Sequence, residues 1–157
     1  MKEHHYTTNV RWIGNTGEGT THYTGYKRDH QVSKSGGSVI ECSSDPVFRG
    51  DALKFNPEEL FLSSISSCHM LWYLHLCTDA KLKVISYTDD PQGTMIEDAD
   101  GGGQFTKVLL RPSVTIAGSA VELESIANDV HYLAHAKCFI ARSCNFKIYI
   151  EPMIYFV

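Results

Sequence analysis

The chain has 157 residues, of which 43% are hydrophobic and 20% are charged, and its formal net charge is −4. These values are typical of one globular domain, here residues 1–157, and they exclude a disordered chain. Because the sequence contains no basic stripe or polybasic run, we expect no nucleic-acid partner.

The first fifty residues predict β-strands separated by turns. Tyr6–Ile13 alternates loosely between polar and apolar residues, Thr20–Tyr26 is rich in threonine and tyrosine, and Val39–Cys42 follows a glycine turn. We therefore expect a strand in each of these three ranges.

A strong helix start follows at Asn56-Pro57-Glu58-Glu59. Asparagine is a good N-cap, proline suits the first helical position, and the two glutamates favour the positive end of the helix dipole. The helix is predicted to run to about Asp79. Residues 60–78 carry no charge, which is long enough to resemble a membrane span. Four serines and two histidines within it favour a buried helix of a soluble protein instead, so we expect no membrane partner.

The middle of the chain predicts further strands. Lys81–Tyr87 alternates as a strand, and two acidic turns at 89–91 and 98–103 bracket a hairpin or a loop. Phe105–Ile116 is predicted to form one strand, in which Pro112 indicates a sheet edge or a bulge.

The second helix is predicted to open at Ser119-Ala120-Val121-Glu122, which has the pattern of a capping box. The chain then ends with a strand at Phe146–Ile150 and an apolar tail at Pro152–Val157. This order of elements predicts an α+β fold, with an antiparallel sheet and two main helices.

Five cysteines are present, an odd number, and none forms a CxxC pair. The disulfide framework of a small secreted domain would be denser and more regular. Since Met1–Trp12 also lacks the apolar core of a signal peptide, we expect a cytoplasmic protein with mostly reduced thiols. In such a compartment a cysteine pair is more often catalytic than structural.

Cys68 in the first helix and Cys138 after the second helix are the candidate reactive pair. A cysteine attacks a peroxide as the thiolate, so its pKa must fall below the usual value of about 8.5. Cys68 lies about 18 Å along the axis from the helix start, too far for the dipole to stabilise a thiolate. We therefore expect an activating arginine, and the candidates before the helix are Arg49 and, further away, Arg28.

Glu58 is the natural carboxylate to hold such an arginine. It precedes Cys68 by about 15 Å along the same helix, which is too far for both to contact one small substrate directly. Either the arginine bridges most of that gap, or the acid and the arginine come from a second subunit. We favour the second subunit, with two such helices crossing near a twofold axis.

Two segments resemble the OsmC/Ohr family of thiol-dependent peroxidases, named for osmotically inducible protein C and organic hydroperoxide resistance protein. The first is Asn56-Pro57-Glu58-Glu59-Leu60 with Ser67-Cys68-His69, and the second is Ala134-His135-Ala136-Lys137-Cys138-Phe139-Ile140-Ala141. The predicted order of strands and helices also matches that family over nearly the whole chain. One departure is Phe139, because the family often has proline after the second cysteine.

The resemblance implies an OsmC-like fold in an intertwined homodimer, with an active site at each end of the interface. It implies that Cys68 is the peroxidatic thiol, that Cys138 is the resolving thiol, and that Glu58 belongs to an Arg–Glu pair. We assign Arg49 as the arginine of this pair, with Arg28 as the alternative.

The implied activity is that of an antioxidant enzyme of the oxidative stress response, which reduces organic hydroperoxides to alcohols. A Cys68 sulfenic acid forms, Cys138 resolves it as a disulfide, and an external thiol or dithiol reduces the disulfide. No metal or organic cofactor is expected. Trp72, Tyr73 and Phe139 are candidates for an apolar pocket that favours organic peroxides.

Two other functions remain open. His131, His135 and Cys138 stand at i, i+4 and i+7 of the second helix, a spacing that could hold zinc. The fold could also serve as a non-catalytic module that binds a small ligand, since a fold does not determine a function. The remaining cysteines, at 42, 77 and 144, are interpreted as core or surface thiols.

Overall fold

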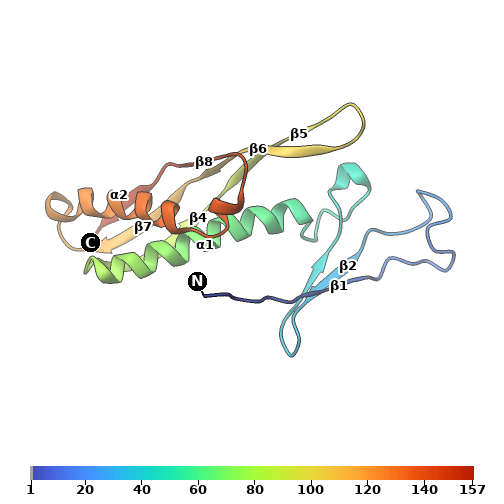
Figure 1. Ribbon diagram of the computed structural model, residues 1–157, viewed down its shortest axis with the longest axis horizontal. Helices are drawn as coiled ribbons and strands as arrows, with labels where there is room; N and C mark the ends of the chain where they lie inside the picture. The colour runs from blue at the N-terminus through green and yellow to red at the C-terminus, as the bar shows by residue number, and fades with distance from the viewer. Residues whose placement is uncertain (1) are drawn as a thin grey trace. The chain divides into compact units, whose positions relative to one another are not determined.

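The structure, a computed structural model, describes residues 2–157. The chain divides into two compact units, the first ending at Leu60 and the second beginning at Phe61. The expectation of a single domain stays a prediction. The long helix α1, Pro57–Asp79, begins in the first unit and continues through the second (Figure 1).

The first unit contains a three-stranded antiparallel sheet in the order β1-β2-β3. Its strands are β1 (Asn9–Trp12), β2 (His30–Ser33) and β3 (Val39–Cys42), followed by the short 3-10 helix η1 (Pro46–Phe48). The first and third predicted strands are therefore confirmed, although β1 is shorter than predicted.

The strand predicted at Thr20–Tyr26 is absent, because this range lies in the turns between β1 and β2. The Asn15 side-chain oxygen accepts hydrogen bonds from the Gly17 and Gly19 amides at 2.9 and 3.0 Å. Both glycines have positive φ, which an extended strand does not use. Local side-chain hydrogen bonds thus replace the ladder that the threonine-rich and tyrosine-rich composition predicted.

Helix α1 begins where the sequence predicted. The Asn56 side chain accepts a hydrogen bond from the Glu59 amide at 2.8 Å, and the Glu59 carboxylate accepts one from the Asn56 amide at 3.0 Å. This reciprocal pair is a capping box, so Glu59 does more than favour the dipole. No helix in the described residues combines the length and hydropathy that crossing a membrane requires.

The second unit contains two further three-stranded sheets, each with one antiparallel and one parallel pairing. The first, in the order β4-β7-β9, is formed by Lys83–Asp89, Pro112–Ala117 and Met153–Phe156. The second, in the order β5-β6-β8, is formed by Gln92–Glu97, Gly103–Leu110 and Lys147–Ile150.

The predicted single strand Phe105–Ile116 is wrong, because the chain leaves one sheet and enters the other at Arg111. The Arg111 amide donates to the Asp89 carboxylate at 2.7 Å, and Pro112 has no amide hydrogen to donate. The apolar tail after Pro152 is strand β9, which pairs in parallel with β7. The α+β class is confirmed, while the two sheets of the second unit are mixed and not purely antiparallel.

Helix α2 spans Ala120–Lys137, as predicted. Ser119 is its N-cap residue, but the serine side chain makes no capping hydrogen bond. The predicted capping box with Glu122 is therefore not formed. Side chains cap the backbone amides at the start of α1 and do not cap those at the start of α2.

Apolar side chains form two clusters in the second unit. The helix-pair cluster joins α1, α2 and the β4-β7-β9 sheet, and its buried members are Tyr73, Cys77, Leu82, Val114, Ile116, Ala127, Val130 and Ala134. A smaller cluster joins the first half of α1 to β6, and its buried members are Ile65, Val108 and Leu110. Along α1 the buried residues recur every four positions, at Ile65, His69, Tyr73 and Cys77. One stripe of the helix therefore faces the interior of this unit.

Candidate active site

The antiparallel packing of α1 and α2 brings Cys68 next to Cys138. The two helices lie side by side in the second unit (Figure 1). The ring of Tyr73 on α1 stacks on the ring of His131 on α2 with centroids 3.8 Å apart. Since the helices run in opposite directions, earlier positions on α1 meet later positions on α2. Cys68 accordingly lies near Cys138, at the end of α2.

Cys138 is the more enclosed of the two thiols. Its side chain is 0% exposed, whereas that of Cys68 is half-buried. Burial raises the pKa of Cys138 to about 12, and the hydrogen bond and charge of Cys68 act in the same direction. Cys138 therefore keeps its proton near neutral pH.

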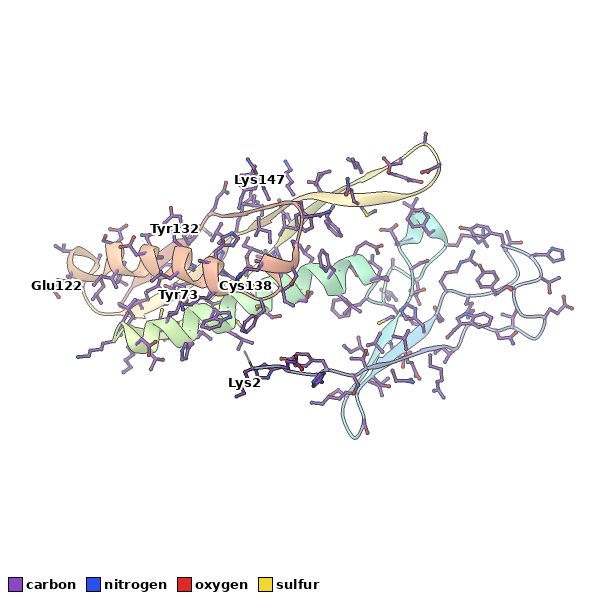
Figure 2. The ribbon with its side chains drawn as sticks, in the orientation of Figure 1. Lys2, Tyr73, Glu122, Tyr132, Cys138 and Lys147 are labelled. Atoms are coloured by element: carbon purple, nitrogen blue, oxygen red, sulfur yellow. The ribbon has the colours of Figure 1, made fainter. Side chains whose placement is uncertain are left out.

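A short turn after α2 fixes the Cys138 sulfur. The chain passes from the C-cap at Cys138 into the 3-10 helix η2, Ala141–Ser143. The Ala141 amide donates to the Cys138 sulfur at 3.4 Å, and the Arg142 amide donates to the Cys138 carbonyl at 3.0 Å. Figure 2 shows the Cys138 and Tyr73 side chains in the part of the second unit where α1 and α2 lie side by side.

All five cysteines are free thiols. Cys42 and Cys77 are buried, and burial raises the pKa of Cys77 to about 11. Cys144 is half-buried and packs against the smaller apolar cluster. These surroundings agree with the interpretation of the three cysteines as structural thiols, and they leave Cys68 and Cys138 as the pair with a shared environment.

The structure describes Arg49 and Glu58 in the first unit. Arg49 is exposed and closes η1 in the left-handed region, with φ of 69°. Glu58 lies in the first turn of α1 and is half-buried. No ion pair between Arg49 and Glu58 is present within residues 2–157. Their participation in a site with Cys68 stays a prediction.

The alternative arginine, Arg28, is already engaged within the first unit. Its guanidinium donates to the Tyr26 and Tyr23 carbonyls at 2.7 and 2.8 Å. It also lies over both tyrosine rings, 4.1 and 4.3 Å from their centroids. These contacts account for its charge and planar shape without reference to a thiolate.

Two of the three predicted pocket aromatics meet beside the thiols. Trp72 lies one helical turn after Cys68, and its ring contacts that of Phe139 edge to face, with centroids 5.7 Å apart. The Lys137 ammonium lies 5.6 Å from the centre of the Trp72 ring. Tyr73 instead belongs to the buried helix-pair cluster. The aromatic surface next to the two cysteines therefore consists of Trp72 and Phe139.

Sequence reasoning missed a buried polar contact between the two helices. His69 and His131 share a hydrogen bond of 3.1 Å between Nε2 and Nδ1, and both rings are almost fully buried. The other ring nitrogens and the Tyr73 hydroxyl have no partner in the described residues. Burial lowers the pKa of His69 to about 4 and that of His131 to about 3, so the pair is neutral near pH 7. Nothing in the sequence relates two histidines so far apart along the chain.

The zinc alternative finds no support in this arrangement. The imidazole of His131 contacts His69 and Tyr73 and does not converge with His135 and Cys138 on one point. Within the part of the chain that the structure describes, no group of three His, Cys, Asp or Glu side chains is placed to hold a metal ion.

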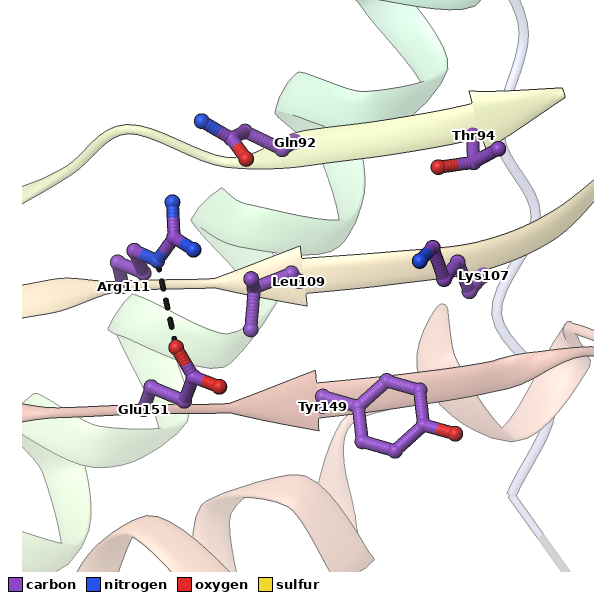
Figure 3. Close-up of a pocket in the computed structure, with 7 residues that line it drawn as sticks. All are labelled: Gln92, Thr94, Lys107, Leu109, Arg111, Tyr149 and Glu151. Atoms are coloured by element: carbon purple, nitrogen blue, oxygen red, sulfur yellow. Dashed lines mark hydrogen bonds and ion pairs between the residues drawn. The ribbon is translucent and has the colours of Figure 1, made fainter.

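A separate polar pocket of about 370 Å³ lies on the β5-β6-β8 sheet (Figure 3). An ion pair of 3.3 Å joins Arg111, just after β6, to Glu151, just after β8. Gln92, Lys107 and Tyr149 are among its lining residues. It contains none of the predicted site residues, and its arginine is already neutralised by the glutamate.

The chain is similar to known proteins over most of its length. The sequence pattern described as OsmC-like protein matches residues 50–152. A solved OsmC-like protein of unknown function from Vibrio cholerae is 34% identical, and the alignment covers 98% of this chain and 100% of that chain with a TM-score of 0.82. No significant match to a curated protein is found.

Two more distant structures are described as organic hydroperoxide resistance proteins. The one from Elizabethkingia anophelis is 20% identical, covers 99% of this chain and 100% of its own, and has a TM-score of 0.67. OhrB of Bacillus subtilis is 19% identical, covers 94% and 98%, and has a TM-score of 0.61. At these identities the likeness concerns the fold alone. The predicted OsmC-like fold is confirmed.

Proposed function

The chain belongs to the OsmC-like protein family, and from this premise we propose that it is a cysteine-based peroxidase that reduces organic hydroperoxides to alcohols. The observation that carries the proposal is the meeting of Cys68 and Cys138 between α1 and the end of α2. One thiol is accessible and the other is enclosed. This difference suits a reactive sulfur and a sulfur that acts second.

The proposed reaction has three steps. The Cys68 thiolate attacks the distal oxygen of the hydroperoxide, the O–O bond breaks, and the alkoxide takes a proton to leave as an alcohol. The Cys138 sulfur then attacks the Cys68 sulfenic acid, so that an S–S bond forms, the S–O bond breaks and water leaves. Finally an external dithiol, or two thiols, reduces the disulfide and is itself oxidised to a disulfide.

The aromatic pair supports an organic substrate over hydrogen peroxide. Trp72 and Phe139 are placed one helical turn from Cys68 and one residue after Cys138, respectively. Phe139 is 65% exposed, so an apolar substituent can still reach it. Burying such a substituent against aromatic carbon gives a favourable free energy that hydrogen peroxide cannot obtain.

We further propose that the active protein is a homodimer, in which Arg49 and Glu58 of one subunit complete the site of the other. The sheet of the first unit supports this proposal, because all of β1 is exposed and only Cys42 of β3 is buried. A sheet with so little covered surface requires another layer for stability.

Sedimentation velocity at about 20 μM tests the dimer. A Val10→Glu substitution on β1, where the side chain is 65% exposed, is expected to shift the protein to monomers. Val121→Glu, at a side chain that is 96% exposed at the start of α2, is the matched control and is expected to leave the dimer intact. A monomeric parent protein would contradict the proposal.

Arg49→Gln is expected to slow hydroperoxide reduction more than Arg28→Gln.

Intact-mass analysis after one equivalent of cumene hydroperoxide tests the peroxidase function. The parent is expected to lose two hydrogens, Cys138→Ser to gain one oxygen, and Cys68→Ser to stay unmodified. An unmodified parent counts against the enzyme. Turnover that survives Cys68→Ser would favour the alternative of a ligand-binding module.

A further inference from the structure

We propose that the outer face of the β5-β6-β8 sheet binds a small aromatic carboxylate, in the polar pocket of about 370 Å³. This binding site goes beyond the proposed peroxidase, and no cysteine lines it. Val108 and Leu110 of β6 are buried in the smaller apolar cluster on the inner face of the sheet. Because side chains alternate along a strand, Lys107 and Leu109 lie on the outer face (Figure 3). The pairing of the strands arranges the outer side chains in rows that cross the sheet.

The first row is cationic. Thr94 of β5 pairs with Lys107 of β6, and Lys107 pairs with Lys147 of β8. Paired residues of neighbouring strands lie about 5 Å apart, so the two ammonium groups repel each other. Within residues 2–157 neither lysine forms an ion pair with an acidic side chain. A carboxylate bound at Lys107 offsets this repulsion, and the Thr94 hydroxyl can donate to it as well.

The second row provides an apolar surface. Leu109 of β6 pairs with Gln92 of β5 on one side and with Tyr149 of β8 on the other. Leu109 is half-buried, whereas Tyr149 is 48% exposed, so its ring is available to a ligand. This row lies about 7 Å along the strands from Lys107, which is two residues. A flat ring attached to the bound carboxylate therefore reaches Leu109 and Tyr149, where burial of apolar surface and aromatic contact favour it.

The ion pair of Arg111 and Glu151 closes the far end of the pocket. Each of these two side chains neutralises the other, so Lys107 remains the cation that selects an anionic ligand. The second oxygen of the Glu151 carboxylate can accept a hydrogen bond from a hydroxyl at the far end of the ring. The chain as a whole has a net charge of −4. Two paired lysines without acidic partners therefore mark this face as a local site for an anion.

A titration of the full chain with 4-hydroxybenzoate, followed by two-dimensional amide NMR, tests the site. We expect a Kd of about 1 mM or tighter, with the largest shifts at residues 92–94, 107–111 and 149–151. Acetate carries the charge without the ring, and 4-hydroxybenzyl alcohol carries the ring without the charge. Each is expected to bind at least about tenfold more weakly. Acetate that binds as tightly as 4-hydroxybenzoate would overturn the aromatic ligand, and largest shifts outside these residues would overturn the site.

Three variants assign the contacts. Lys107→Gln keeps most of the side-chain length without the charge and is expected to weaken binding of 4-hydroxybenzoate about tenfold. Tyr149→Ser is expected to weaken it roughly threefold to tenfold. Lys83→Gln, at an exposed lysine of the other sheet, is the matched control and is expected to leave the Kd unchanged. Equal affinity in the parent and in Lys107→Gln would overturn the inference. The titration contains no peroxide, so this failure is distinct from a failure of the proposed peroxidase function.

Discussion

The two units of the chain differ in what stabilises them. The second unit buries two apolar clusters against α1, and the two cysteines that we propose as the reactive pair lie where α1 meets the end of α2. The first unit buries little apolar surface, and polar contacts are prominent in it, such as the Lys54–Asp29 ion pair of 2.8 Å. Close packing can hold two sulfurs in a defined contact, whereas an uncovered sheet depends on another surface. Cys68 and Cys138 therefore meet within the second unit, whereas Arg49 belongs to the first.

The largest expected effect contrasts one isoleucine from each unit. Ile65→Ala removes a fully buried side chain on α1, and the free energy of unfolding should fall by about 2–5 kcal/mol. Ile40→Ala, at a side chain 39% exposed on β3, should cost no more than about 1 kcal/mol in the monomer. Urea denaturation at low protein concentration measures both. An equal loss of unfolding free energy in the two variants would mean that the β1-β2-β3 sheet is covered, which would contradict the difference between the two units.

Acid should destabilise the second unit through its histidine pair. Burial holds the pKa of His69 at about 4 and that of His131 at about 3, against a usual value of about 6.5. Below pH 6.5 the unfolded chain therefore binds protons at these two imidazoles that the folded chain does not bind. The contribution of the neutral pair to the free energy of unfolding is complete above pH 6.5 and declines as the pH falls toward 4. Between pH 7.5 and 5.0 the expected loss is about 2 kcal/mol for each imidazole.

A double substitution isolates this effect. His69→Gln with His131→Gln should flatten the dependence of the unfolding free energy on pH between 7.5 and 5.0. His75→Gln is the matched control, because His75 is exposed on the same helix and should leave the slope unchanged. A slope that persists in the double variant would show that other groups bind the protons.

The smallest expected effect compares the starts of the two helices. Asn56→Ala breaks a formed capping box and should lower the free energy of unfolding by about 1 kcal/mol. Ser119→Ala removes a side chain that makes no capping hydrogen bond, so it should cost only a few tenths of that amount. Thermal denaturation of both variants checks the order. If Ser119→Ala lowered the free energy of unfolding more than Asn56→Ala, the two helix starts would not differ in capping as described.

Local signals predicted the helices well because helix ends depend on neighbouring residues. Asn56 and Pro57 marked the start of α1 correctly, and α2 occupies the predicted range. Strand pairing depends on distant residues, and there the predictions were weaker. The sequence alone does not reveal that Phe105–Ile116 changes sheets at Arg111, or that the apolar tail pairs in parallel with β7.

The candidate site shows the same contrast between features that sequence signals predict and contacts that depend on distant residues. Family motifs predicted Cys68 and Cys138 as the reactive pair, and the antiparallel helices place these two residues near each other. The His69–His131 contact was missed because each histidine was assessed by its spacing along the chain, which grouped His131 with His135. Tertiary packing, and not spacing, decides which imidazoles meet.

Disulfide mapping after a single oxidation shows whether hydroperoxide links Cys68 to Cys138. The parent is treated with one equivalent of cumene hydroperoxide, free thiols are alkylated, and the digest is analysed by mass spectrometry without reduction. We expect one linked peptide pair containing Cys68 and Cys138, with Cys42, Cys77 and Cys144 alkylated after unfolding. A disulfide that joins other cysteines, or oxidation that leaves Cys68 as a free thiol, would contradict it.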